Sequence, residues 1–335
     1  MKPSIAVRNT LTVAILTLLV AAPVAADRQS FFELCRSGNH RQVRRAIRRG
    51  EPVLETDTGG RTALFAAAEH NENPRVVEVL VDAGIPVNAA DNSGETALMQ
   101  AAASNANPEV TDALIEAGAD VNARAPRLGR TPLMYAAGLN DNPKVAARLL
   151  EAGASLDAED ATLLHWTPIF YAAGWGDNPE VIAVLVDGGA DVNRVSSRVH
   201  RTPLMAAAAR NANVEVTEAL IAAGAEVQGR TMTGTTALTE AAMNNENPAV
   251  CRVLVEEGAR INLADEMMQM TPLMFAASRN ANPDVLHTLL DLGADPQPVD
   301  RRGLKALDYA RENQNLSGSD VMPRLDAGED AGTSL

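Results

Sequence analysis

The stretch Thr131–Asp157, TPLMYAAGLNDNPKVAARLLEAGASLD, decides the fold. Thr131 precedes a proline and an apolar run, which is the pattern of a helix N-cap followed by a residue whose missing N–H costs nothing in the first turn. Asn142-Pro143 repeats this start signal, and Gly153 ends the second apolar run. The stretch therefore predicts two short helices joined by a tight turn and followed by an extended loop.

The same unit recurs along the chain. Its opening threonine returns at intervals of 34 to 36 residues, at Thr62, Thr96, Thr131, Thr167, Thr202, Thr236 and Thr271. A period of this length is typical of a solenoid of stacked units and not of separate domains. The Asn that follows each Ala-rich first helix, such as Asn105, is expected to close that helix in the left-handed conformation.

These units closely resemble ankyrin repeats. The resemblance rests on the Thr-Pro-Leu opening, the Ala-Ala pair and the Gly-Ala-Asp-Val-Asn close, and it covers about residues 30–314. It implies an all-α ankyrin-repeat solenoid of helix-turn-helix units joined by β-hairpin-like loops. The family's usual His after Thr-Pro-Leu is replaced, for example by Met134, and the turn between the helices is one residue longer. Neither departure changes the expected fold.

The two ends of the chain differ from the repeated units. Residues 1–26 have a basic start, an apolar core and small residues before Asp27, which is the layout of a cleaved secretory signal peptide. A retained membrane anchor is the alternative. The array is expected over 27–316, with an N-terminal cap at about 30–61, seven repeats at about 62–301 and a C-terminal cap at about 302–316. Residues 317–335 are expected to form a flexible acidic tail.

The net charge and the predicted signal peptide together indicate where the protein is located and which classes of partner it does not bind. The pattern resembles the exported bacterial type of ankyrin protein and predicts a periplasmic or secreted protein. Cleavage removes Lys2 and Arg8 and no acid, so the net charge falls from -14 to -16. Nucleic acids and anionic membranes attract clustered positive charge, so we expect neither as a partner, and we expect no stable membrane insertion after cleavage. The Arg-rich segment 41–49 is either a solvated cap face or a binding site.

The mature protein is expected to be a monomer.

The sequence shows no pattern of catalytic or metal-binding residues. The five His lie in different repeats, and Cys35 and Cys251 have no metal-ligand spacing, so both cysteines are interpreted as core residues. The loop-tip Asp residues are expected to make turn hydrogen bonds and not to bind calcium. We therefore predict a non-enzymatic module that binds another protein without a cofactor or a metal. The alternatives are an exported hydrolase or small-ligand-binding protein with a site in the groove, and a host-directed effector.

Positions that vary between repeats mark the expected binding face. The resemblance implies binding along the concave side, which the loop tips and the first helices form. Both tryptophans of the chain, Trp166 and Trp175, fall on this face within one repeat, and Trp and Arg are prominent in interface energetics. Their packing as local core is the alternative. The predicted partner-binding residues are Arg130, Leu139, Trp166, Trp175, Arg201, Arg210, Met267, Met268, Met270 and Arg279. Leu163 and Leu164 would extend the patch, whereas Tyr135 and Tyr171 are expected in the core.

Overall fold

A computed structural model of the protein describes residues 31–326, so the predicted signal peptide lies outside the described residues. The chain divides into two compact units, Met1–Arg127 and Leu128–Leu335. Within 31–326 the secondary structure is helical apart from two isolated β-bridges, Thr56–Thr62 and Ala90–Thr96. The predicted solenoid of paired helices is confirmed in each unit.

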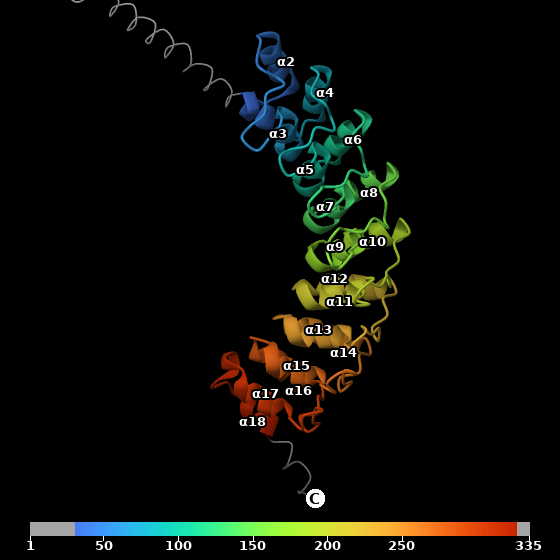
Figure 1. The fold of residues 1–335 in the computed structure, drawn as a ribbon, viewed down its shortest axis with the longest axis vertical. Helices are drawn as coiled ribbons and strands as arrows, with labels where there is room; N and C mark the ends of the chain where they lie inside the picture. Colours follow the sequence, from blue (N-terminus) through green and yellow to red (C-terminus); the bar gives the residue numbers. More distant parts are fainter. Residues whose placement is uncertain (1–30, 327–335) are drawn as a thin grey trace, which may run out of the picture. The chain divides into compact units, whose positions relative to one another are not determined.

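The first unit contains three helix pairs. Residues 31–37 are helical, and the labelled helices are α2 (His40–Arg48), α3 (Ala63–His70), α4 (Pro74–Asp82), α5 (Ala97–Ser104) and α6 (Pro108–Glu116). The first helix of one pair packs on the first helix of the next, as α3 does on α5, and α4 packs in the same way between α2 and α6. The unit is therefore two layers of helices (Figure 1).

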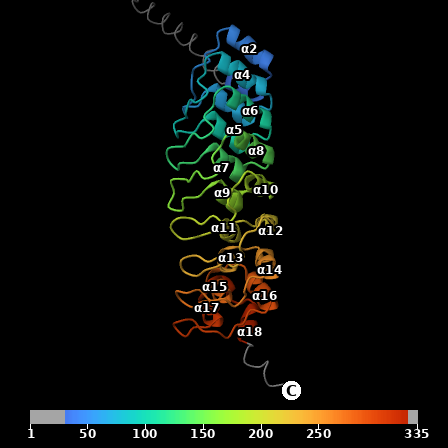
Figure 2. The same ribbon diagram turned by 90° about the vertical axis from the view of Figure 1, so that its right-hand side faces the viewer.

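The second unit continues the same plan through six helix pairs. They are α7 (Pro132–Leu139) with α8 (Pro143–Glu151), α9 (Pro168–Trp175) with α10 (Glu180–Asp187), α11 (Pro203–Arg210) with α12 (Val214–Ala222), α13 (Ala237–Asn244) with α14 (Pro248–Glu256), α15 (Pro272–Arg279) with α16 (Pro283–Asp291), and α17 (Ala306–Glu312) with η1 (Gln314–Leu316) and α18 (Val321–Asp326). Figure 2 shows the loops on the side of the first helices, away from the second helices. The first helices and the loops therefore share one face.

Local signals explain where the helices begin and end. The Thr side chain accepts a hydrogen bond from the N3 amide in five of the seven repeats, as Thr131 does from Met134, whereas Thr62 and Thr167 make no such bond. Most second helices of the repeats begin after an Asn that caps them, as Asn142 caps α8, whereas α10 begins after Pro179 and the Glu180 amide donates to Asn178 Oδ1. Each second helix of a repeat is followed by a glycine with positive φ, such as Gly153 at 88°. These starts and stops confirm the predicted unit.

The Asn that ends each first helix is not left-handed, so that expectation was wrong. Asn245, for example, is extended, with φ -99° and ψ 128°. Its Nδ2 donates to the backbone oxygens of Ala208 at 3.0 Å and Asn211 at 2.8 Å, both in the preceding repeat, and its Oδ1 accepts from the amide of Asn247. The side chain therefore joins two repeats and starts the next turn, which satisfies buried carbonyls that would otherwise be unpaired.

The C-terminal end contains a helix where the sequence predicted a flexible tail. Helix α18 lies at Val321–Asp326 and packs on α16 and α17. Val321 and Leu325 are fully buried, and Arg324 Nη2 lies 2.6 Å from Asp291 Oδ1. Because these apolar side chains cover the end of the helix layer, the cap continues past residue 316. Residues 327–335 lie outside the described part.

The core is made of small and aliphatic side chains, as predicted. Cys35 and Cys251 are both fully buried free thiols, and burial raises the pKa of each to about 12. They are core residues. Between residues 31 and 326, no helix combines the length and the apolar character that crossing a membrane requires.

Candidate protein-binding surface

The loop tips are held by aspartates, as the sequence predicted. Asp265 accepts hydrogen bonds from the amides of Met267, Met268 and Met270, at 3.0, 3.0 and 2.7 Å. Asp91 holds its own loop in the same way, through the amides of Ser93 and Glu95. Nowhere in the described part do three or more His, Cys, Asp or Glu side chains gather as a metal site. The carboxylates are used to shape the loops.

Trp166 is buried, which corrects its predicted place on the exposed face. Its side chain is 1% exposed, and its ring stacks on Phe170 with the centroids 5.6 Å apart. Gly174 lies next to this ring, and a Cβ there would be in ordinary contact with it at 3.4 Å. Trp166 is therefore local core, and the alternative interpretation of this residue was correct.

Trp175 and Leu139 are exposed, as predicted, and form the apolar part of the surface. Trp175 at the end of α9 is 41% exposed, and Leu139 at the end of α7 is 59% exposed. The Trp175 ring rests on two buried rings, Trp166 at 4.7 Å and Tyr171 at 5.1 Å between centroids. A rigid aromatic side chain supported from below is the kind of group that anchors protein interfaces.

Two arginines flank this aromatic group. The Cζ of Arg130 lies 5.3 Å from the centroid of the Tyr171 ring, and the Cζ of Arg210 lies 5.4 Å from the Trp175 ring. Together with the contact between Tyr171 and Trp175, these distances define a continuous row of side chains. We call it the aromatic–arginine row: Arg130, Tyr171, Trp175 and Arg210. Each guanidinium is held by the negative face of a ring.

A buried hydrogen-bond chain fixes one end of the row. Arg130 Nε donates to the Tyr171 hydroxyl at 3.0 Å, and that hydroxyl donates to Asp160 Oδ2 at 2.8 Å. Burial and the hydrogen bond to Asp160 raise the pKa of Tyr171 above its usual range, so the phenol stays neutral and keeps its proton. The ring is thus locked in one orientation beneath the surface.

A small cavity opens beside the row, between α7 and α9. Its volume is about 120 Å³, and it is lined by Arg130, Met134, Tyr135, Gly138, Leu139, Tyr171 and Trp175. Gly138 keeps the cavity open, because it leaves one wall without a side chain. Small-molecule sites usually measure roughly 300–1,000 Å³, so this cavity is of a size for one side chain and not for a cofactor.

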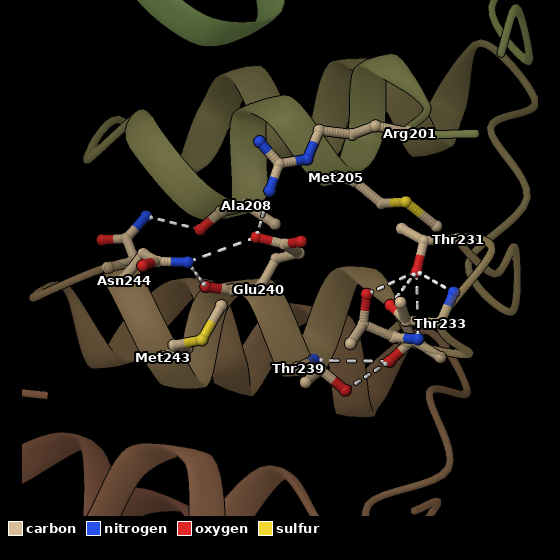
Figure 3. Close-up of polar contacts among 12 residues, drawn as sticks. Arg201, Met205, Ala208, Thr231, Thr233, Thr239, Glu240, Met243 and Asn244 are labelled. Carbon is tan, nitrogen blue, oxygen red and sulfur yellow. Dashed lines mark hydrogen bonds and ion pairs between the residues drawn. The ribbon is translucent and has the colours of Figure 1, made fainter. Parts of the chain in front are cut away.

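Arg201 belongs to a different part of the same face. Its Nη2 lies 2.7 Å from the buried carboxylate of Glu240, to which Asn244 also donates at 3.2 Å (Figure 3). Arg201 and Glu240 border a second cavity of about 470 Å³, which Leu164 and Met232 also line. The predicted rim arginine is therefore already occupied in an ion pair.

The remaining predicted residues lie in later repeats, outside the aromatic–arginine row. Met270 is 7% exposed and Met268 is half-buried, because Asp265 folds the loop over them, so only Met267 at 57% offers an apolar surface. Arg279 is exposed, and its Nη1 approaches Met243 Sδ at 3.5 Å. The structure does not bring these residues together with Trp175.

Glycines and one aspartate are the part of the site that sequence reasoning missed. Gly138 and Gly174 follow the Ala-Ala pair in consecutive repeats, at positions where other repeats hold a residue with a side chain. Gly176 stands where other repeats have the helix-ending Asn, and a Cβ there would meet the Ala137 oxygen at 2.8 Å. Three such glycines within two repeats are a readable signal that the backbone is approached closely there. Nothing in the sequence identified Asp160 as the partner of Tyr171.

Comparison with known proteins identifies the family. The model for ankyrin repeats in three copies matches residues 31–125, 102–196 and 195–265, and a single-repeat model matches 268–301. These matches cover most of the chain, so the chain belongs to the ankyrin repeat family. Ankyrin repeats indicate a protein–protein interaction module, and proteins of this class generally act as non-enzymatic scaffolds.

Relatives among curated proteins are similar over a short segment. Ankyrin repeat and SOCS box protein 6 of Mus musculus is 38% identical over 79 residues, which is 24% of this chain and 19% of that protein. The Homo sapiens protein of the same name is 37% identical over 79 residues, 24% of this chain and 18% of its own length. The chain thus matches about a fifth of these relatives. They are mammalian, so the exported bacterial type stays a prediction.

Proposed function

We propose that this chain is an exported, non-enzymatic module that binds a partner protein through the face formed by its first helices and loops. Trp175, Leu139, Arg130 and Arg210 form the centre of the binding surface. The observation that carries the proposal is one exposed Trp beside an apolar cavity, supported by buried rings and flanked by two arginines. Interface energy concentrates in such anchors.

The shape of the site supports binding over catalysis. The cavity beside Trp175 is small and lined mainly by apolar and aromatic side chains. Tyr171 is the titratable group there whose pKa departs from its usual range, and the shift keeps it neutral. A buried group of perturbed acids and bases in a deep cleft would have favoured the hydrolase alternative. We assign no catalytic residue.

Export is part of the proposal and rests on the sequence of residues 1–26. Cleavage before Asp27 would release a protein into the periplasm or the medium. Mass spectrometry of the protein recovered from the producing cell would test this. A mature N-terminus at Asp27 supports export, and an intact N-terminus on protein in the cytoplasm contradicts it.

The binding surface is tested by pairing affinity capture with thermal unfolding. The mature chain captures its partner from an envelope extract, and mass spectrometry identifies it. Trp175→Ala is expected to weaken the partner's binding by about 2 kcal/mol or more, with little change in Tm. Leu133→Ala is the stability control, because this fully buried side chain leaves a core cavity and lowers stability by about 2–5 kcal/mol.

Trp166→Ala distinguishes the structural role of Trp166 from the binding role of Trp175. Because Trp166 is buried, its truncation should lower stability by about 3–5 kcal/mol, unlike that of Trp175. A Trp175→Ala protein that is folded and captures the partner as well as wild type would show that the partner uses another surface. The exposed Met267 loop and the Arg-rich segment 41–49 would then be examined.

A further inference from the structure

The two arginines of the aromatic–arginine row have no carboxylate partner in the described part of the chain. Arg130 uses Nε for the Tyr171 hydroxyl, and its two terminal nitrogens donate to no described residue. The Arg210 Cζ lies 5.4 Å from the centroids of both the Trp166 and the Trp175 rings, and Arg210 makes no ion pair with a described carboxylate. Arg201, on the same face, differs from them because it pairs with Glu240 at 2.7 Å.

Carboxylates of the chain near this surface are already committed. Asp160 is buried, and it accepts from the Tyr171 hydroxyl and from the amides of Thr162 and Trp166. Glu159 pairs with Arg194 at 3.1 Å. The row therefore presents two arginines without a direct carboxylate partner among the described residues, on a chain whose net charge is -14.

The cavity fixes the position of an apolar group relative to these cations. Arg130 is part of its lining, and Leu139 and Trp175 form its exposed edge. A volume of about 120 Å³ suits a single aliphatic or aromatic side chain. A segment whose apolar side chain enters the cavity places its neighbouring atoms against the guanidinium of Arg130.

We propose that this surface binds a short segment of the partner protein in which an apolar side chain stands next to a carboxylate. This proposal rests on the proposed function and names the chemistry of the partner. The apolar side chain fills the cavity, and Arg130, which lines the same cavity, binds the carboxylate through charge-assisted hydrogen bonds, while Arg210 at the other end of the row adds a longer-range attraction. Both guanidinium groups are stacked on rings, so little further ordering is needed when the carboxylate binds.

Peptide selection with the full chain tests the proposal. The full-length protein is used to select from a displayed random peptide library, and the enriched sequences are compared with those selected by Arg130→Gln. Wild type should enrich segments with Asp or Glu beside an aliphatic or aromatic residue. The variant should lose this enrichment. Enrichment of basic segments, or of segments without acids, would overturn the proposal.

Synthetic peptides then measure each contribution by fluorescence anisotropy. Replacing the acid of an enriched peptide by its amide should weaken binding about tenfold, and Arg130→Gln should do the same to the acidic peptide, whereas Arg210→Gln should have a smaller effect. Arg252→Gln is the matched control, an exposed arginine in the second helix α14, and should change nothing. Peptides ending in a free carboxylate or in an amide distinguish a chain terminus from an Asp or Glu side chain as the source.

Gly138→Ala tests the cavity without removing a charge. The new methyl would meet Tyr171 at ordinary contact distances of 3.4–3.5 Å, and alanine favours the helix by about 1 kcal/mol over glycine. We expect an unchanged or higher Tm together with at least tenfold weaker peptide binding. Unchanged peptide binding would overturn the proposed use of the cavity.

The two proposals fail in different ways. If the library yields no enriched peptide while capture of the partner still depends on Trp175, the acidic–apolar segment is wrong and the binding surface stands. If capture of the partner is insensitive to Trp175, the proposed function itself is wrong.

Discussion

At the scale of single residues, three loops hold a residue where the backbone favours glycine. The residue two positions before the repeat threonine has positive φ, and in several repeats it is a glycine such as Gly234 at 83°. In three loops it is His165 at 49°, His200 at 51° or Gln269 at 60°. A side chain in this left-handed region costs about 1–2 kcal/mol. These loops therefore keep a strain that other repeats avoid.

Replacing one of these residues by glycine should release the strain. We predict that Gln269→Gly raises the free energy of unfolding by about 1 kcal/mol. This net value includes the loss of the hydrogen bond from Gln269 Nε2 to the Asp265 backbone oxygen. Gly234→Ala is the opposite control, because its Cβ would lie 2.7 Å from the Glu266 amide nitrogen. Urea unfolding measures both. A lower stability of Gln269→Gly would show that the loop is not strained.

Asp300 should make stability depend on acid pH. Burial alone would raise the pKa of this carboxyl, but hydrogen bonds from Tyr309, from the Leu304 and Arg302 amides and from the Arg302 side chain outweigh burial and lower the pKa to about 2. A carboxyl whose pKa is lower in the folded state stabilises the fold above the pKa of the unfolded chain, about 4, and this contribution is lost as the pH falls through 2.

The pH prediction is measured by comparing wild type with Asp300→Asn. The variant should be less stable than wild type at pH 5 to 7, and the difference in Tm should shrink between pH 4 and pH 2. A difference in Tm that is the same at pH 6 and at pH 2.5 would contradict the assignment of the low pKa to Asp300.

At the scale of the helices, buried asparagines join most repeats to the one before. Asn71, Asn105, Asn211, Asn245, Asn280 and Asn313 each donate to two backbone oxygens of the preceding repeat. Helices of eight or nine residues are marginal alone, so contacts between repeats supply their stability. The asparagine hydrogen bonds are the polar part of these stabilising contacts between repeats.

Removing one of them should be costly. Asn245→Ala leaves the buried oxygens of Ala208 and Asn211 without this donor, so we predict a loss of about 1–3 kcal/mol or more. Asn315→Ala is the control, because Asn315 is exposed. Chemical unfolding of both variants gives the two values. Equal stability of the two variants would mean that water replaces the lost hydrogen bonds.

The sequence predicts helices well where the repeat recurs and poorly where it ends. Thr131, Asn142 and Gly153 mark helix ends through local backbone chemistry, which any copy of the unit repeats. Helix α18 has no such pattern, since it depends on Val321 and Leu325 covering α16 and α17. A short segment of this composition is interpreted as a tail unless the surface that it covers is known.

At the scale of the whole molecule, the fold was predictable because helix contacts join neighbouring repeats within each unit. A pattern that recurs in sequence then recurs in space.

The binding surface was predictable only in part. The repeat register placed Trp166 and Trp175 on the same face, but Trp166 packs on Phe170 and is buried, whereas Trp175 is exposed. The pairing of Arg201 with Glu240 joins two repeats, and the repeat pattern alone does not encode it.

Stability within such an array should vary with position along the chain. Terminal repeats have a neighbour on one side only and open more easily than interior ones. Cys35 lies in the first described helical segment, whereas Cys251 lies in α14, which packs on α12, α13 and α16. Both thiols are fully buried and share a pKa of about 12, so each reacts only when its repeat opens.

Thiol labelling of the full chain under native conditions should therefore modify Cys35 at least ten times faster than Cys251, as measured by mass spectrometry of the digested protein. Asn71→Ala should increase the labelling rate of Cys35 further, because Asn71 Nδ2 donates to the Cys35 backbone oxygen at 2.8 Å. It should leave the labelling rate of Cys251 unchanged. Equal rates in denaturant provide the control for intrinsic reactivity. Equal rates under native conditions would mean that both cysteines are exposed by one global unfolding event, because separate local openings would give each thiol its own rate.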